Sequence, residues 1–328
     1  MKTNKATIVF FGTPEFAVPS LKALIDNGYH VVAVVTNPDK PIGRKQVITP
    51  SPVKELAKKH GIPVLQPEKL DANYKLQTIN YKPDIFIIAS YGKIIPKDVL
   101  AIPKHGTLNV HPSLLPKYRG PSPIQAAILK GEEKTGVTIM LTDEKMDHGP
   151  ILAQKALENV RFSAEGGKVQ SSKFNELYEA LAKLGAELLV ETLPKWLAGE
   201  ITPEEQDHAK ATYTKILKKE DGKIDWEHSA EEIERKIRAF EVWPGSWSMA
   251  RIRGKNTRIK VIEAKIDGDR DFAVKPGSLI KKKGDLLVAS RNKFLVIEKL
   301  QLEGRKTITG SEFLKGYPDI SFFLPALS

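Results

Sequence analysis

Two strand-like stretches decide the fold: PDIFIIAS at residues 83–90 and GTLNVH at residues 106–111. The first contains five consecutive apolar residues, which is typical of a strand that is covered on both faces. Similar runs occur on either side of this pair, namely ATIVFFG at 6–12, VVAVVT at 31–36, IPVLQP at 62–67 and VTIMLT at 137–142. Helical patterns separate the runs, such as PSLKALIDNG at 19–28 and the helix start at Ser51 and Pro52. This alternation predicts a doubly wound, Rossmann-like α/β domain with a parallel sheet.

The middle of the chain predicts one long helix and then a linker. Leucines recur over residues 171–198 at spacings of four, three and four, which places them on one face of a helix. The segment PKWLAGEITPEEQDH at 194–208 is polar and is broken by Gly199 and Pro203. Such a composition is typical of a linker between domains.

The last third of the chain changes character. A helical pattern at residues 230–240 is followed by short strand-like runs: RIKVIEAKI at 258–266, GSLIKKKGDLLVAS at 277–290 and KFLVIEKLQLEG at 293–304. Asp-Gly, Pro-Gly and Lys-Gly turns separate them, which predicts a small OB-like β-barrel. We therefore expect an α/β domain over 1–193, a linker over 194–208 and a β-barrel domain over 209–328.

Charge is distributed unevenly along the 328 residues, which carry a formal net charge of +11. Residues 1–208 contain 26 Lys and Arg against 23 Asp and Glu, whereas residues 209–328 contain 25 against 17. The positive last third indicates a polyanionic partner, although a basic surface that serves only solubility gives the same pattern. Cysteine is absent, which excludes a disulfide scaffold, a thiolate metal site and a cysteine nucleophile. Because no apolar run approaches the roughly 18 residues that span a bilayer, we expect a cytoplasmic protein without membrane contact.

The densest group of candidate functional residues begins where the strand GTLNVH ends. Side chains on a strand alternate between faces, so Asn109 and His111 point the same way. Open α/β sheets bind ligands at the carboxyl ends of their strands. There an asparagine amide can donate a hydrogen bond to an oxyanion, and a histidine can move a proton. An Asn/His pair that only caps a turn is the competing interpretation.

A second group follows the strand VTIMLT and contains Asp143, Glu144 and Asp147. A carboxylate close to His111 would orient the ring and hold one tautomer. The alternative is an acidic loop that is merely solvated. A third possibility, dinucleotide binding, is disfavoured because residues 12–16 after the first strand lack the further glycines of the G-x-G-x-x-G fingerprint.

In combination, these residues resemble a known family. Asn109-x-His111, Ser113-Leu-Leu-Pro116, and Asp147-x-Gly149 placed 36 residues after the histidine are similar to the 10-formyltetrahydrofolate-dependent formyltransferases. The resemblance covers roughly residues 7–317 and narrows to the branch that formylates methionyl initiator tRNA. The motifs that narrow it are FGTPEF at 11–16, PIGRK at 41–45, SPVK at 51–54, IDW at 224–226, AF at 239–240 and WPG at 243–245.

The resemblance implies a role for each part of the chain. Residues 1–193 would transfer the formyl group of 10-formyltetrahydrofolate to the α-amino group of methionyl initiator tRNA, and residues 209–328 would bind the tRNA. Asn109 would stabilise the oxyanion, His111 would donate a hydrogen bond and carry a proton, and Asp147 would orient His111. The implied folate contacts are Ile87, Tyr91, Ile95, Ser113, Leu114, Leu115, Pro116 and Asp143. The candidate tRNA contacts are Lys40, Arg44 and Lys45 in the loop 37–50, and Arg251, Arg253, Lys281 and Lys282 in the last domain. We expect a monomer without a metal ion.

Several other functions share part of this pattern. A formyltransferase for a small amine, such as a nucleotide sugar or glycinamide ribonucleotide, would carry the same three residues. A hydrolase of 10-formyltetrahydrofolate could carry a similar second domain. A non-catalytic RNA-binding protein is disfavoured because all three residues are present, and a dehydrogenase is disfavoured because the glycines are missing.

Overall fold

The computed structural model of the chain describes residues 6–43, 46–71, 74, 78–157, 173–269, 273–318, 320, 323 and 324. The chain forms two compact units. The first consists of Met1–Pro123, Lys134–Glu158 and Tyr178–Lys215, and the second of Ile124–Glu133, Asn159–Leu177 and Ile216–Ser328. Across the described ranges, every helix is too short or too polar to span a bilayer.

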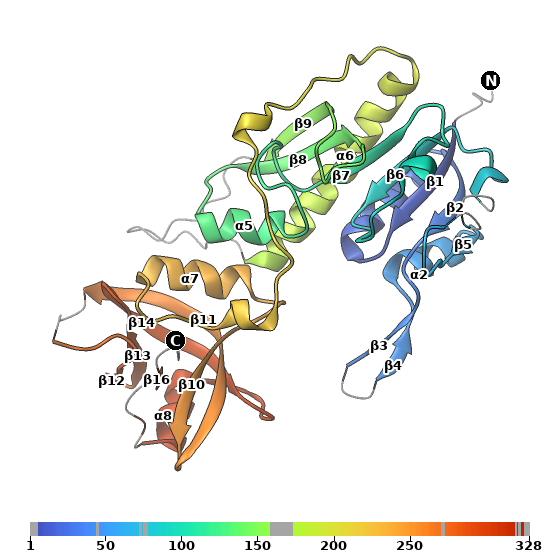
Figure 1. Ribbon diagram of the computed structural model, residues 1–328. Coiled ribbons are helices and arrows are strands. Elements are labelled where there is room, and N and C mark those ends of the chain that lie inside the picture. Colours follow the sequence, from blue (N-terminus) through green and yellow to red (C-terminus); the bar gives the residue numbers. More distant parts are fainter. Residues whose placement is uncertain are drawn as a thin grey trace. The chain divides into compact units, whose positions relative to one another are not determined.

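A seven-stranded sheet forms the centre of the first unit (Figure 1). Its strands, in order across the sheet, are β5 (Val64–Leu65), β2 (His30–Val35), β1 (Thr7–Gly12), β6 (Ile85–Ala89), β7 (Thr107–His111), β8 (Thr135–Leu141) and β9 (Ile151–Leu157). The first five strands are parallel, and β1, β6 and β7 are almost completely buried. The predicted α/β domain with a parallel-rich sheet is confirmed.

Two strands depart from the parallel arrangement that we expected. β8 runs antiparallel to β7, and β9 runs antiparallel to β8. The apolar run of β8 predicted its burial correctly, but such a run carries no information about strand direction. β9 escaped prediction because it lies at the edge of the sheet, is mostly half-buried and therefore lacks a continuous apolar run.

Helices pack against this sheet. They are α1 (Val18–Asp26), α2 (Pro52–Lys59), α4 (Lys97–Leu100) and the long α6 (Phe174–Leu197). The predicted start of α2 is confirmed, since the Ser51 hydroxyl accepts a hydrogen bond from the Lys54 amide at 3.1 Å. The predicted long helix is α6, although residues 171 and 172 of its expected range lie outside the described residues. A Cβ on Gly185 would lie 2.7 Å from Val110 Cγ1, so α6 approaches β7 closely at this glycine.

The basic loop expected over residues 37–50 contains a short hairpin. β3 (Lys40–Ile42) pairs antiparallel with β4 (Val47–Thr49), and Figure 1 shows the hairpin extending away from β2 and α2. Arg44 and Lys45 lie outside the described residues. The side chains of Val47 and Ile48 are 58% and 70% exposed, so the strand lacks the alternation of buried and exposed residues from which strands are predicted.

The second unit combines an antiparallel sheet with α5 (Pro123–Lys130, in this unit from Ile124 on), α7 (Ala230–Ala239) and α8 (Gly310–Gly316). The sheet order is β12 (Leu279–Lys282), β13 (Asp285–Ala289), β14 (Lys293–Leu302), β11 (Lys255–Asp269), β10 (Ser246–Ile252) and β16 (Phe323–Leu324), and β15 (Thr307–Thr309) pairs with β14. Its core gathers aliphatic side chains around Trp226, which stacks on Phe323 with ring centroids 5.3 Å apart. A β-sheet domain in the last third of the chain is confirmed, and its sheet is antiparallel. The described pairings do not join β12 to β16 into the closed barrel that we expected.

Candidate active site

Three of the predicted residues meet at the carboxyl end of β7. Asn109 and His111 lie on this strand with one residue between them, so their side chains share a face. The Asn109 amide nitrogen donates a hydrogen bond to Asp147 Oδ1 at 3.2 Å, and His111 Nδ1 lies 3.6 Å from Asp147 Oδ2. The side chains of His111 and Asp147 are only 5% and 15% exposed, so water screens their electrostatic interaction poorly.

The Asp147 carboxylate and its turn are held by backbone geometry. Oδ2 accepts a hydrogen bond from the Gly120 amide at 2.7 Å. Asp147 has a φ of +47°, a left-handed conformation that aspartate tolerates better than most residues. A Cβ on Gly149 would lie 2.2 Å from the Leu141 carbonyl oxygen, so only glycine fits there. The Asp-x-Gly spacing therefore has a geometric reason.

The backbone also selects the tautomer of His111. Its Nε2 lies 3.0 Å from the carbonyl oxygen of Tyr118. Because a carbonyl oxygen can only accept, Nε2 carries the hydrogen. In the neutral ring Nδ1 is then unprotonated, and Nδ1 is the nitrogen that faces Asp147. His111 can therefore take up a proton at Nδ1, where the carboxylate stabilises the resulting cation.

The loop 113–116 is hydrogen-bonded to a buried hydroxyl on β8. Thr138 Oγ1 donates a hydrogen bond to the Ser113 carbonyl at 2.7 Å and accepts one from the Leu115 amide at 3.1 Å. The Ser113 hydroxyl donates to the Lys117 carbonyl at 2.6 Å. Of the folate contacts predicted in this loop, Ser113 and Leu115 are buried, whereas Leu114 and Pro116 are half-buried.

The other predicted folate contacts lie in two places. Ile87 is fully buried in β6, and Tyr91 and Ile95 belong to the hydrophobic core. The Tyr91 hydroxyl has no hydrogen-bond partner among the described residues, and burial raises its pKa to about 12. Asp143 is 36% exposed in the loop after β8 and accepts a hydrogen bond from His148 Nδ1 at 2.6 Å. Asp143 thus lies on the turn that carries Asp147, while the three apolar residues lie inside the sheet domain.

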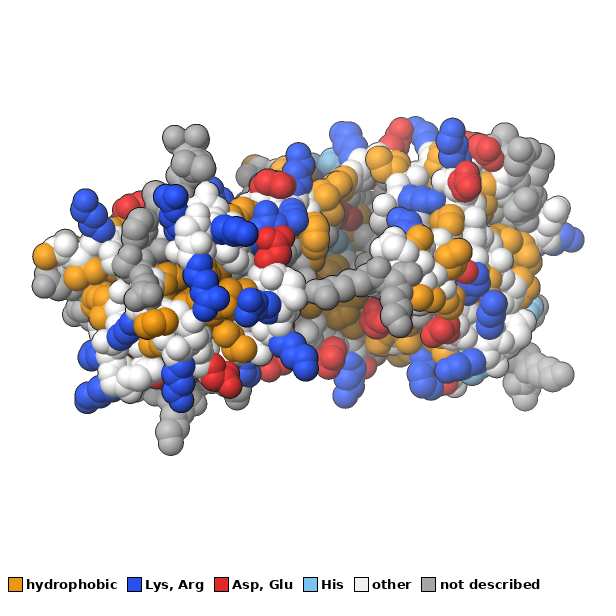
Figure 2. Space-filling model, turned by 90° about the horizontal axis from the view of Figure 1, so that it is seen from below, with side chains coloured by type: hydrophobic (Ala, Val, Ile, Leu, Met, Phe, Trp, Pro, Cys, Tyr) orange, Lys and Arg blue, Asp and Glu red, His pale blue; other side chains and the backbone are white. Residues whose placement is uncertain are grey.

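The predicted tRNA contacts that the structure describes are exposed and lie on separate hairpins: Lys40 on β3, Arg251 on β10, Arg253 in the turn between β10 and β11, and Lys281 and Lys282 on β12. Figure 2 shows Lys and Arg side chains spread among hydrophobic ones over the face of the second unit, at the left of the view. The Arg253 guanidinium lies 5.7 Å from the centroid of the Tyr317 ring, and that of Arg258 lies 4.3 Å from the Trp247 ring. Arg253 and Arg258 therefore each combine a positive charge with a cation–aromatic contact.

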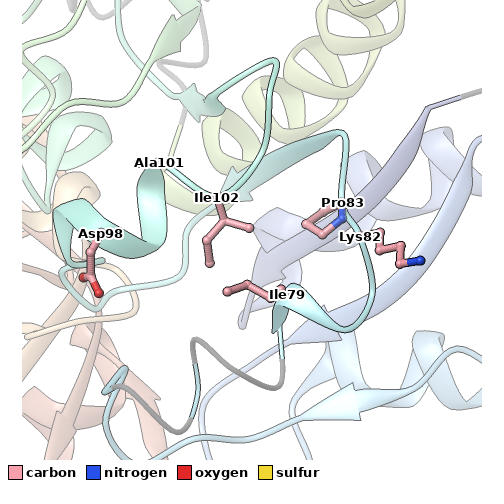
Figure 3. Close-up of a pocket in the computed structure, with 6 residues that line it drawn as sticks. All are labelled: Ile79, Lys82, Pro83, Asp98, Ala101 and Ile102. Atoms are coloured by element: carbon pink, nitrogen blue, oxygen red, sulfur yellow. The ribbon is translucent and has the colours of Figure 1, made fainter.

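A hollow of about 590 Å³ lies away from these residues, beside the amino end of β6 (Figure 3). It is lined by Ile79, Lys82, Pro83, Asp98, Ala101 and Ile102. None of the lining residues belongs to the group around His111, and ligands of open α/β sheets bind at the opposite, carboxyl ends of the strands. The hollow is therefore not the candidate active site.

Sequence reasoning missed the residues that complete the frame around the three side chains. Gly120 and Tyr118 act through backbone atoms, which no side-chain motif reveals. Gln206 lies in the segment predicted as a linker, yet its amide nitrogen donates to both carbonyl oxygens that flank the turn 147–149, at 3.0 and 2.7 Å. The sequence offered one signal for this group. Arg119 is a charged residue in an apolar, proline-rich loop, and a charged residue there needs polar partners if it is buried. In the structure Arg119 is 1% exposed.

Comparison with known proteins decides the family. A formyl transferase family model matches residues 5–193, and a model of the formyl transferase C-terminal domain matches residues 216–318. The methionyl-tRNA formyltransferase of Thermodesulfovibrio yellowstonii is 45% identical over 314 residues, which cover 94% of this chain and 95% of the relative. That of Bacillus subtilis is 41% identical over 315 residues and covers 94% of each chain. This chain belongs to the methionyl-tRNA formyltransferase family.

Solved structures share the fold of this methionyl-tRNA formyltransferase family member. HypX from Aquifex aeolicus in complex with tetrahydrofolic acid has a TM-score of 0.60 at 17% identity, over 97% of this chain and 48% of that chain. The N-formyltransferase from Helicobacter canadensis, in complex with folinic acid and dTDP-3-aminofucose, has a TM-score of 0.63 at 20% identity, over 89% and 99%. Family membership confirms the predicted enzyme class, a formyltransferase with a formyl-tetrahydrofolate co-substrate.

Proposed function

We propose that this chain transfers the formyl group of 10-formyltetrahydrofolate to the α-amino group of methionyl initiator tRNA, and that Asn109, His111 and Asp147 carry out the transfer. The product is N-formylmethionyl-tRNA for translation initiation. One observation carries the residue assignment: the Asp147 carboxylate lies against both the Asn109 amide and the His111 ring. An oxyanion donor and a proton acceptor thus stand side by side, which formyl transfer to an amine requires.

His111 moves the proton in this scheme. The attacking α-amino group has an ordinary pKa of about 7.7–8.0, so part of it is neutral near pH 7 and no nucleophilic side chain is needed. As the amine nitrogen bonds to the formyl carbon it loses a proton, which His111 accepts at Nδ1 next to the Asp147 carboxylate. The proton then goes to the departing folate nitrogen as its bond to the formyl carbon breaks. His111 returns to the neutral tautomer that the Tyr118 carbonyl favours.

Asn109 stabilises the negative charge that develops on the formyl oxygen. One N–H of its amide is bonded to Asp147 Oδ1, which fixes the plane of the amide. The second N–H is then directed by the same plane and donates to the oxyanion. A donor oriented before the reaction stabilises a transition state more than one that must reorganise.

The surroundings of Asp143 fit the pterin ring of the folate. Thr142 Oγ1, directly before Asp143, is buried without a hydrogen-bond partner among the described residues. A pterin carries N–H donors and a carbonyl acceptor that suit a hydroxyl and a carboxylate. We propose that the pterin lies between Asp143 and the loop from Ser113 to Pro116. Contact with Ile87, Tyr91 and Ile95, which are at most 7% exposed, requires the side chains that cover them to move on binding.

Residues 209–328 bind the tRNA in this proposal, with 1–193 as the catalytic domain and 194–208 as the linker. The excess of positive charge in this part of the sequence and the exposed basic hairpins support the assignment. The Phe323 amide donates to the Gly277 carbonyl at 2.7 Å, which connects the two ends of the antiparallel sheet and supports an OB-like barrel. A cytoplasmic monomer completes the proposal.

The experiment that tests the function compares three acceptors for labelled formyl from 10-formyltetrahydrofolate: methionyl initiator tRNA, methionyl elongator tRNA and water. We expect rapid transfer to the initiator tRNA alone. Release of formate without transfer would identify a hydrolase. Binding of the folate without either product would point to a small-amine acceptor, and both of these results would contradict the proposal.

A further inference from the structure

Residues 204–214, which we call the strap, belong to the first unit and are hydrogen-bonded to the rest of it at several points. Glu204 exchanges backbone hydrogen bonds of 2.7 and 2.8 Å with Ile151 at the start of β9. Further along, the backbone N–H and C=O of Arg119 pair with the strap on either side of Tyr213, at 2.8 and 2.7 Å. The strap therefore lies beside the loop that follows β7, and its first residues fall within the expected linker.

The side chain of Gln206 joins the strap to the catalytic turn. Oε1 accepts hydrogen bonds from Arg119 Nε at 3.1 Å and from a terminal guanidinium nitrogen at 2.7 Å. Because a guanidinium only donates, the Gln206 oxygen must face Arg119 and its nitrogen must face away. That nitrogen donates to the carbonyl oxygens of Asp147 and Gly149. Gln206 thus holds the backbone of the turn, while Gly120 holds the carboxylate.

Arg119 fixes the Gln206 amide in this orientation. Its side chain is 1% exposed, and the guanidinium also donates to His208 Nδ1 at 2.8 Å and to the Tyr213 hydroxyl at 3.2 Å. These acceptors are neutral, since His208 must be unprotonated at Nδ1 to accept. A buried cation is costly when its donors lack partners. Rotation of the Gln206 amide would break two of these bonds, so the N–H groups stay on the turn.

We propose that Gln206 is a positioning residue for the formyl transfer, which it serves by holding Asp147 at its distance from His111. The inference rests on the proposed function, because the position of Asp147 affects the rate only if Asp147 takes part in the reaction. The competing role is purely structural, namely that Gln206 only satisfies the buried charge of Arg119. The two roles use opposite ends of one amide, so a single substitution separates them.

That substitution is Gln206→Glu. The carboxylate still accepts from Arg119 and adds an ion pair, but it presents an oxygen to the carbonyl oxygens of Asp147 and Gly149. A small misplacement of a catalytic group costs up to about 100-fold in rate. We expect kcat to fall about 10–100-fold, with KM for both substrates within about threefold of wild type, and thermal unfolding serves as the control for folding. Wild-type kcat in Gln206→Glu would leave Gln206 with the structural role alone and overturn the inference.

Amide hydrogen exchange at Gly120 gives a second readout that does not depend on turnover. The Gly120 N–H is bonded to the Asp147 carboxylate, so a turn that is held less firmly should exchange this hydrogen faster. The matched control is Asp207→Ala, the next strap residue, whose carboxylate contacts the Ala209 amide and Lys210 within the strap. We expect faster exchange in Gln206→Glu and wild-type exchange and kcat in the control. Equal exchange in Gln206→Glu and wild type would contradict the inference.

Asp147→Asn distinguishes failure of the inference from failure of the proposed function. If Asp147→Asn transfers formyl within about threefold of the wild-type rate, the assignment of the catalytic residues fails. If Asp147→Asn loses the activity while Gln206→Glu retains wild-type kcat, only the positioning role of Gln206 fails.

Discussion

The carboxyl end of β7 and the hairpins of the second unit hold their functional groups in opposite ways. Asn109, His111 and Asp147 are connected by contacts of 3.2 and 3.6 Å between poorly exposed side chains. Arg251 and Lys281 stand exposed on β10 and β12. Proton transfer and oxyanion stabilisation need fixed geometry, whereas attraction to phosphates acts over a Debye length and tolerates mobile side chains. A single substitution should therefore lower the reaction rate strongly at the first region, whereas at the second it should weaken tRNA binding only slightly.

The largest effect is expected for Asn109→Ala. Loss of one oxyanion donor typically lowers kcat by about 10²–10³, and the substitution also removes the hydrogen bond to Asp147. Single-turnover transfer to methionyl initiator tRNA measures the chemical step directly. Thermal unfolding serves as the control for folding, and a rate within about threefold of wild type would refute the assignment of Asn109.

Binding of tRNA by the second unit should weaken as the salt concentration rises. If three phosphates are neutralised, the dissociation constant for tRNA should rise by about 40-fold between 50 and 200 mM salt, because counterions are released on binding. Filter binding across this range measures the slope, and kcat at saturating tRNA should stay constant. A flat response would mean that the basic hairpins do not contact the phosphate backbone.

A single hairpin residue should have a smaller effect. Arg251→Ala is expected to reduce the slope of log Kd against log salt by about one and to weaken tRNA binding only a few-fold, since it removes one exposed charge. The control is Lys22→Ala on α1, which also removes one positive charge but from an ion pair with Asp26 at 2.6 Å. Equal slopes in Arg251→Ala and Lys22→Ala would exclude Arg251 from the interface.

The smallest effect on activity is expected for a carboxylate at the other end of the sheet. The Thr7 amide donates to Asp84 at 2.7 Å and, with Lys104 at 3.0 Å, lowers the pKa of Asp84 to about 2. The ionised form thus stabilises the fold above the unfolded-state pKa of about 4, and this contribution is lost as the pH falls through about 2. Asp84→Asn should leave kcat unchanged and lower the free energy of unfolding more at pH 6 than at pH 3. Urea unfolding at both pH values measures this, and an equal loss at both would contradict it.

The sequence predicted the three side chains that meet at the carboxyl end of β7. Strand periodicity placed Asn109 and His111 on one face, and the resemblance to the formyltransferases singled out Asp147 among the three acidic residues of its loop. The partners Gly120 and Tyr118 were not predictable, because they act through main-chain atoms whose positions depend on the path of a loop. Gln206 was not predicted, because the polar segment around it, which is broken by glycine and proline, has the composition of a linker.

Some strands of the fold were likewise predictable from the sequence, and others were not. Continuous apolar runs identified β1, β2 and β6 because both faces of these strands are covered. The direction of β8 is not encoded in its local composition, because an apolar run is compatible with either strand direction. The hairpin β3–β4 is held by its own backbone pairing rather than by a hydrophobic face, and for that reason it left no periodic pattern.

The strap is synthesised after the turn that contains Asp147, so the order of synthesis bears on when this turn is held in place. Gln206 follows Asp147 by about sixty residues. At about 5–20 residues per second of synthesis, the turn leaves the ribosome several seconds before the amide that holds it. A nascent chain that ends within α6 therefore contains β7 and the turn with Asp147 but lacks Gln206. Activity should arise late in translation, when the residues that lead out of the first unit close back onto it.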